Sequence, residues 1–155
     1  MRAAPESFAQ VFIAQELANA GARVMLEASV LALAKDSSEV RPVPITRSGR
    51  IDIAVYYDSL APRLFIEVKK LSSAKSLNKD HERIVELLAC CSKSQHGVMI
   101  GYTTGVKLST VTSLLQAVAF ETGTKVVRTL SPIEVRTKMN TKRFLGAAVY
   151  RVDPN

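Results

Sequence analysis

The chain has 155 residues, the length of one compact domain. Apolar residues make up 47% and charged residues 23%, and these near-average values exclude a disordered chain, a collagen-like chain and a coiled-coil rod. Lysine and arginine outnumber aspartate and glutamate by 21 to 14, so the net charge is +7. Such a charge suits a polyanionic partner such as nucleic acid, but it also occurs in basic proteins that have no such partner.

The basic excess is concentrated towards the C-terminus. Residues 124–155 contain seven lysines and arginines against two acids, which is +5 of the total +7. We therefore expect a single domain over residues 1–155 with a basic C-terminal extension over about 124–155. Such a segment can follow a phosphate backbone, or it can be a solvated surface.

The residue pattern at the start of the chain predicts a helix, then a strand and then a loop. Helical spacing of apolar residues predicts a helix from Pro5 to Gly21, and residues 22–30 read as a strand. Residues 31–34 could instead begin a helix. The stretch 35–48 contains two prolines and is interpreted as a loop with an extended piece rather than a central strand.

Residues 51–57 and 64–69 are the strongest predicted strands, and residues 58–62 make a five-residue hairpin connection between them. A helix starting at Ser76 or Asn78 and ending near Ser92 follows. The remaining elements are a strand, a helix and two strands, over residues 97–102, 109–122, 125–130 and 144–152. We expect the last strand at the edge of the sheet or across its end.

This order predicts an α/β fold with a mixed central sheet and helices on both faces. No apolar run reaches the roughly 18–20 residues that a membrane-spanning helix needs, and the N-terminus does not resemble a signal peptide. Cys90 and Cys91 are adjacent, so a disulfide between them is not expected, and both fit a reducing compartment. We therefore expect a cytoplasmic protein without a membrane partner.

Three charged residues on the predicted hairpin carry the functional argument. Because strand side chains alternate, Asp52 lies opposite the apolar face of its strand, and Glu67 and Lys69 share one face of theirs. Paired residues of antiparallel strands lie within about 5 Å, and diagonal neighbours within about 8 Å. We therefore expect Asp52, Glu67 and Lys69 to meet at one place.

Two neighbouring carboxylates repel, and burying them unpaired costs several kcal/mol. A divalent cation reverses that cost, and Mg²⁺ commonly takes one or two carboxylates plus waters and substrate phosphates. An ammonium beside such a cation can position a water or stabilise charge on a phosphate. The three residues are therefore the minimum parts for metal-dependent phosphodiester hydrolysis, whereas the alternative is a structural charge network in an unrelated domain.

The stretch SGRIDIAVYYDSLAPRLFIEVKK resembles the core of the PD-(D/E)xK, or restriction-endonuclease-like, nuclease superfamily. The element order resembles its αβββαβ core over about residues 5–103, and residues 49–70 carry the motif. The resemblance implies that Asp52 and Glu67 hold Mg²⁺ (or Mn²⁺), helped by the Val68 carbonyl, and that Lys69 is the motif lysine that orients the attacking water. Ile51 stands where the motif's name has proline.

Many members of this superfamily carry another acid on the first helix. The closest position here is Gln10, which is not an acid, and Glu6, Glu16 and Glu27 are the alternatives. The helix after the motif often contributes a basic or amide side chain, and Lys79 and Arg83, four residues apart, could contact phosphate.

The sequence therefore predicts a metal-dependent nuclease that acts on nucleic acid, with DNA preferred. The alternative is a catalytically inactive member of the same fold that binds nucleic acid or protein. The sequence does not decide between DNA and RNA, or between an endonuclease and an exonuclease. Because a chain of this size has no second domain to grip a substrate, a homodimer or a larger complex is also open.

Overall fold

The computed structural model describes residues 6–37, 49–58, 61–90, 95–137 and 139–153. The helices are α1 (Glu6–Asn19), α2 (Val30–Ser37), α3 (Asn78–Cys90) and α4 (Leu108–Thr122), and a 3₁₀ turn, η1 (Ala74–Leu77), comes directly before α3. The strands are β1 (Arg23–Ser29), β2 (Arg50–Tyr56), β3 (Pro62–Lys70), β4 (His96–Gly105), β5 (Lys125–Arg136) and β6 (Lys142–Val152).

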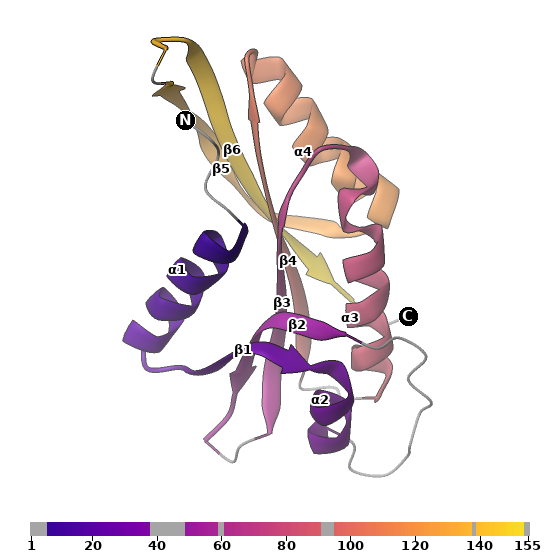
Figure 1. Ribbon diagram of the computed structural model, residues 1–155. Helices are drawn as coiled ribbons and strands as arrows, with labels where there is room; N and C mark the ends of the chain where they lie inside the picture. The colour runs from indigo at the N-terminus through magenta and orange to yellow at the C-terminus, as the bar shows by residue number, and fades with distance from the viewer. Residues whose placement is uncertain (1–5, 38–48, 59–60, 91–94, 138, 154–155) are drawn as a thin grey trace.

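The described strands form one six-stranded sheet in the order β1-β2-β3-β4-β6-β5. β3 and β4 are parallel, and every other neighbouring pair is antiparallel. Figure 1 shows α1 on one face of this sheet and α2, α3 and α4 on the other. The predicted α/β fold with a mixed sheet and flanking helices is therefore confirmed.

Alternation along β2 and β3 produces the two faces of the core. Ile53 and Val55 from β2 and Ile66 and Val68 from β3 pack with α1. Phe65 points to the other face and is fully buried beneath the remaining helices. Strands buried on both faces lie in the middle of such a layered fold, and this is the region that carries Asp52, Glu67 and Lys69.

The prediction that Ile51 shares a face with Ile53 is wrong. Ile51 is buried with Ala28 in the cluster beneath α2, α3 and α4. Glu27, which precedes Ala28 in β1, has a positive φ of 53°. This irregularity reverses the alternation of β1 from Ala28 onward, and Ile51, the pairing partner of Ala28, follows it to the same face.

α3 lies close to the sheet because β4 offers it a residue without a side chain. A Cβ atom at Gly97 would overlap the Ile84 side chain of α3 and would crowd Leu88. The small residue therefore fixes how near α3 comes to β4. This approach also sets the position of Arg83, the residue before Ile84.

The C-terminal strands depart from their predicted places. β6 lies between β4 and β5, so the prediction that it forms the edge or crosses the end of the sheet is wrong. β5 is the edge strand and continues beyond Leu130 to Arg136, because an edge strand tolerates Pro132 at its register irregularity. The segment expected as a basic C-terminal extension thus contributes two strands to the sheet.

Two further differences concern local structure. Residues 31–34 belong to α2 and not to the strand, which was the alternative open from the sequence. Of the two predicted starts of the helix, the structure has Asn78, and Ser76 lies in the 3₁₀ turn before α3. Within that turn, the hydroxyl oxygen of Ser76 accepts the Ser73 N–H at 2.9 Å. Most of the predicted loop at 35–48, and residues 59–60 of the hairpin connection, lie outside the described residues.

None of the described helices is long and apolar enough to cross a membrane.

Candidate functional site

The candidate site lies where β2 and β3 part. Their pairing runs from Tyr56 to Ile53 on β2 and ends at the Ile53–Ile66 pair. Beyond it, β2 stays paired with β1, and β3 stays paired with β4. We call this opening the β2–β3 fork.

Asp52 fills the fork from the β2 side. Its Oδ2 accepts the main-chain N–H of Val68 at 2.7 Å, so a side chain replaces the strand partner that β2 no longer supplies. The N–H and C=O of one residue in an extended strand point to the same side, so the Val68 carbonyl faces the fork as well. Since a carboxylate has about four lone-pair sites, Asp52 retains acceptor capacity.

Glu67 enters the fork from β3 and is only 3% exposed. Burial raises the pKa of Glu67 to about 9, helped by the charges of Asp52 and Asp80 and by a hydrogen bond with Asp52, whereas Arg83 opposes the shift. The two carboxyl groups of Asp52 and Glu67 therefore lie together, as the sequence predicts. Without a further cation, a proton is the simplest way to relieve their repulsion.

Lys69 lies near the end of β3, two residues after Glu67, at what we call the exit of the fork. Its side chain lies between two acids from different helices. Its Nζ donates to Glu6 Oε1 of α1 at 3.2 Å and lies 4.0 Å from Asp80 Oδ2 of α3. Burial alone would lower the pKa of Lys69, but the Glu6 hydrogen bond and the charges of Asp80, Glu6 and Asp52 outweigh it and raise the pKa. Lys69 is therefore held as an ammonium ion.

Of the acids considered on or near the first helix, the structure brings Glu6 to the site. Besides binding Lys69, Glu6 Oε2 accepts the main-chain N–H of Lys70 at 3.1 Å. Gln10 is buried one turn further along α1, and Glu16 and Glu27 are exposed. A first-turn acid is also favoured at a helix N-terminus, so this place suits Glu6 in both respects.

The two basic residues predicted on α3 separate. Arg83 turns inwards, and its Nη1 donates to Glu67 Oε1 at 2.6 Å and to Asp80 Oδ1 at 3.3 Å. Lys79 is exposed. Arg83 therefore belongs to the charge cluster of the fork, and the phosphate contact of the exposed Lys79 stays a prediction.

Sequence reasoning missed Asp80, which is 8% exposed and contacts both Lys69 and Arg83. Burial raises the pKa of Asp80, although Lys69 and Arg83 act in the opposite direction. The pattern that could have found it is its spacing, because Asp80 lies four residues before Ile84 and seven before Leu87, on the apolar stripe of α3.

The fork offers the oxygen donors that a hard divalent cation takes. Asp52 and Glu67 supply two carboxylates, and the Val68 carbonyl faces the same opening. Among the residues that the structure describes, no group of three or more His, Cys, Asp or Glu side chains is arranged to hold a metal ion. A cation here would therefore complete its shell with a main-chain oxygen and waters, as Mg²⁺ commonly does.

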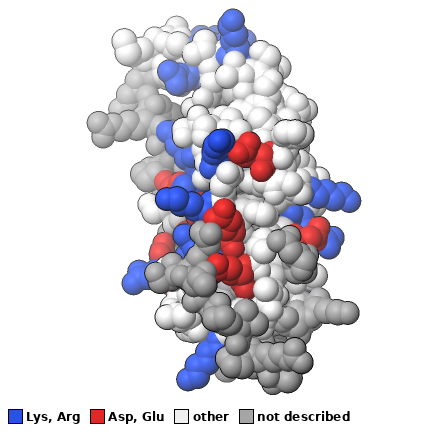
Figure 2. All heavy atoms as spheres, turned by 90° about the vertical axis from the view of Figure 1, so that its right-hand side faces the viewer, with Lys and Arg blue, Asp and Glu red and all other residues white. Residues whose placement is uncertain are grey.

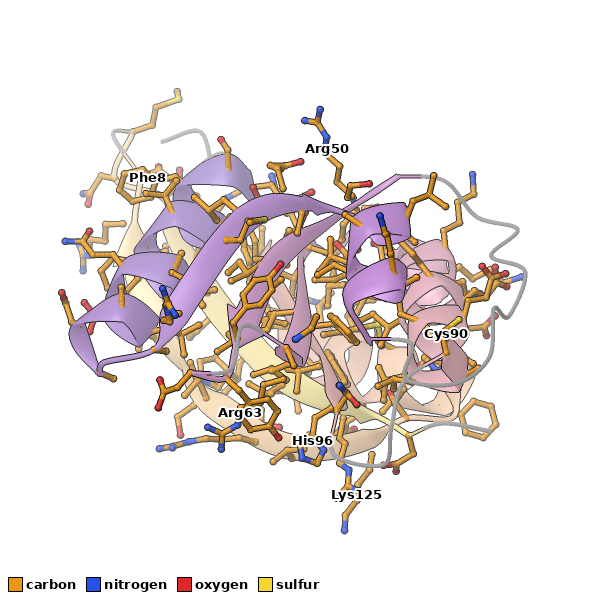
Figure 3. All side chains as sticks on the ribbon, turned by 90° about the horizontal axis from the view of Figure 1, so that it is seen from below. Phe8, Arg50, Arg63, Cys90, His96 and Lys125 are labelled. Carbon is orange, nitrogen blue, oxygen red and sulfur yellow. The ribbon has the colours of Figure 1, made fainter. Side chains whose placement is uncertain are left out.

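The molecular surface carries charges of both signs. Figure 2 shows that acidic side chains run down the middle of the helical face, with lysine and arginine side chains on either side. Figure 3 shows Arg63, His96 and Lys125 together on one side of the molecule and Arg50 pointing outwards on the opposite side. Arg63 and His96 lie near the starts of β3 and β4, at the other end of these strands from the fork.

Comparison of the chain with protein-family models, curated proteins and solved structures finds no match.

Proposed function

We propose that the chain is a metal-dependent nuclease of the PD-(D/E)xK type that hydrolyses phosphodiester bonds, with DNA as the preferred substrate. The observation that carries the proposal is the convergence of Asp52 and Glu67 in the fork, with Lys69 at its exit. The order α1, β1, β2, β3, α3 and β4 supports it, because it matches the αβββαβ core with α2 inserted.

The roles follow from the chemistry of each group. A divalent cation bound by Asp52, Glu67 and the Val68 carbonyl would supply a Lewis acid for the phosphate and its attacking water. Lys69, kept as an ammonium by Glu6 and Asp80, can donate hydrogen bonds but cannot accept a proton. Its role is therefore to orient the water or to stabilise negative charge on the phosphate, and not to act as the general base.

The C-terminal hairpin supports a polyanionic partner. Lys125 of β5 lies directly across from Arg151 of β6, and Arg136 lies across from Lys142. Like charges at directly opposed positions destabilise a sheet, and a phosphate backbone would relieve that repulsion. Arg151 pairs with Asp153 and Lys142 pairs with Glu134, so one member of each opposed pair is balanced within the chain.

The test is cleavage of supercoiled plasmid, linear duplex and single-stranded DNA in Mg²⁺, Mn²⁺ or EDTA. We expect cation-dependent cleavage by the wild type and a loss of at least about 100-fold in Glu67→Gln and Lys69→Met. Glu16→Gln and Lys107→Met remove the same charges from exposed positions and should keep full activity. Wild-type rates in both site variants would overturn the assignment.

One observation favours a second candidate, a catalytically inactive module of the same fold that binds nucleic acid or protein. Arg83 already contributes a positive charge 2.6 Å from Glu67. In such a module the guanidinium would replace the divalent cation permanently. Absence of cleavage on all three substrates, together with retained DNA binding in EDTA, would select this candidate.

A further inference from the structure

Arg83 occupies a position that resembles the place of a bound cation. Its Nη1 lies 2.6 Å from Glu67 Oε1, 3.3 Å from Asp80 Oδ1 and 3.3 Å from the main-chain oxygen of Arg50. These three oxygens come from β3, α3 and β2, so the guanidinium ties together the elements that form the fork. Two carboxylates and a carbonyl are also the donor types that Mg²⁺ and Mn²⁺ select.

We propose that Arg83 is an internal cation that competes with the divalent metal ion for Glu67, so that metal binding requires the guanidinium to leave this carboxylate. The inference rests on the proposed function, since it uses the metal site at the fork. It goes further because it gives Arg83 two alternative positions, where the sequence suggested only a phosphate contact.

Electrostatics explains why the two cations exclude each other. Arg83 donates hydrogen bonds to the buried carboxyl groups of Glu67 and Asp80, and breaking a buried pair by removing one partner is strongly destabilising. With a divalent cation on Glu67, a guanidinium at the same oxygen would face a like charge at contact distance. Arg83 thus stabilises the fork before the metal ion binds and opposes the ion when it arrives.

When the Arg83 guanidinium leaves Glu67, it can stay bound to Asp80. Asp80 lies three residues earlier on the same helix and already accepts a hydrogen bond from it, so the guanidinium can keep this partner while it turns outwards. The fork-shaped guanidinium binds phosphate oxygens in a bidentate manner. A substrate phosphate would therefore draw Arg83 away from Glu67 and favour metal binding.

The experiment measures Mn²⁺ binding by calorimetry without nucleic acid, in the wild type, Arg83→Gln and Lys79→Met. Lys79→Met is the matched control because it removes one positive charge from an exposed position on the same helix. We expect Arg83→Gln to bind Mn²⁺ at least tenfold more tightly than the wild type, and Lys79→Met to stay within twofold of the wild type. Equal tightening in both variants, or none in Arg83→Gln, would overturn the inference.

A second measurement does not depend on the folding of the Arg83 variant. In the ¹⁵N-labelled wild type, added Mg²⁺ should shift the side-chain resonance of Arg83, and the shift should vanish in Asp52→Asn. Mg²⁺ binding that requires Asp52 but leaves the Arg83 resonance in place would refute the competition and leave the proposed nuclease standing. Absence of any binding that depends on Asp52, in wild type and Arg83→Gln alike, would remove the metal site and both proposals with it.

Discussion

At the scale of single residues, the fork concentrates more negative charge than its cations balance. Burial and the nearby charges of Asp52 and Asp80 all raise the cost of ionising Glu67. Burial raises the pKa of Glu67 to about 9, so in the absence of metal this group keeps a proton through neutral pH. The unfolded chain loses that proton near the ordinary glutamate pKa.

This difference predicts how stability depends on pH. Between the unfolded and folded pKa values, the folded state holds one more proton, so the stabilising contribution is complete at low pH and is lost as pH rises towards about 9. Glu67→Gln cannot titrate, so in EDTA its stability relative to the wild type should rise between about pH 5 and about pH 8, by on the order of a few kcal/mol.

Urea unfolding of both proteins at the two pH values checks this prediction. Glu16→Gln, at an exposed position of α1, serves as the control and should follow the wild type at both pH values. An unchanged difference between Glu67→Gln and the wild type across the pH range would mean that Glu67 does not hold the extra proton.

Part of this cluster could be predicted from the sequence, for a clear physical reason. Hairpin register is local and puts Asp52 opposite Glu67, although the two strands part there and the Asp52 side chain bridges the gap to Val68. The direction from which a helix approaches a sheet depends on tertiary packing. The sequence therefore did not distinguish Glu6 from its alternatives, and it did not show Arg83 turning inwards.

Among the strands, β1 carries backbone strain at the level where it pairs with β2 beside the fork. Glu27 has a φ of 53°, a left-handed conformation that non-glycine residues rarely adopt. Its neighbours Leu26 and Ala28 pair with Ile53 and Ile51, so Glu27 lies at the level of Asp52. Strained residues tend to persist where the surrounding structure determines their conformation.

We predict that Glu27→Gly is more stable than Glu27→Ala by about 1 kcal/mol, because only glycine adopts a left-handed backbone without a Cβ penalty. Both substitutions remove the same exposed carboxylate, so charge does not enter the comparison. Thermal and urea unfolding of the pair measure the difference. Greater stability of the alanine variant would show that the left-handed conformation is absent in solution.

The arrangement of elements was harder to predict than their existence. Hydrophobic patterning placed a strand near residues 144–152, and β6 covers that range. Its position between β4 and β5 depends on contacts between segments far apart in the chain, and local propensity contains no information about them. The same limit applies to Ile51, whose face depends on the conformation of Glu27 in a neighbouring strand.

In the molecule as a whole, the fork is where four elements from the first 90 residues of the chain meet. α1 contributes Glu6, β2 contributes Asp52, β3 contributes Glu67 and Lys69, and α3 contributes Asp80 with Arg83. The C-terminal strands extend the sheet beyond β4 and carry most of the basic excess. The molecule thus combines a buried acidic centre with a basic flank, and the proposed cleavage of a polyanion would use both.

We propose that Asp52 and Glu67 hold one divalent cation between β2 and β3, and anomalous diffraction from a crystal soaked in Mn²⁺ can locate that ion. We expect a peak within bonding distance of carboxylate oxygens of both residues, next to the Val68 carbonyl, with the Arg83 guanidinium moved off Glu67. A fork without a peak, in a crystal where Mn²⁺ binds elsewhere or not at all and Arg83 still contacts Glu67, would contradict it.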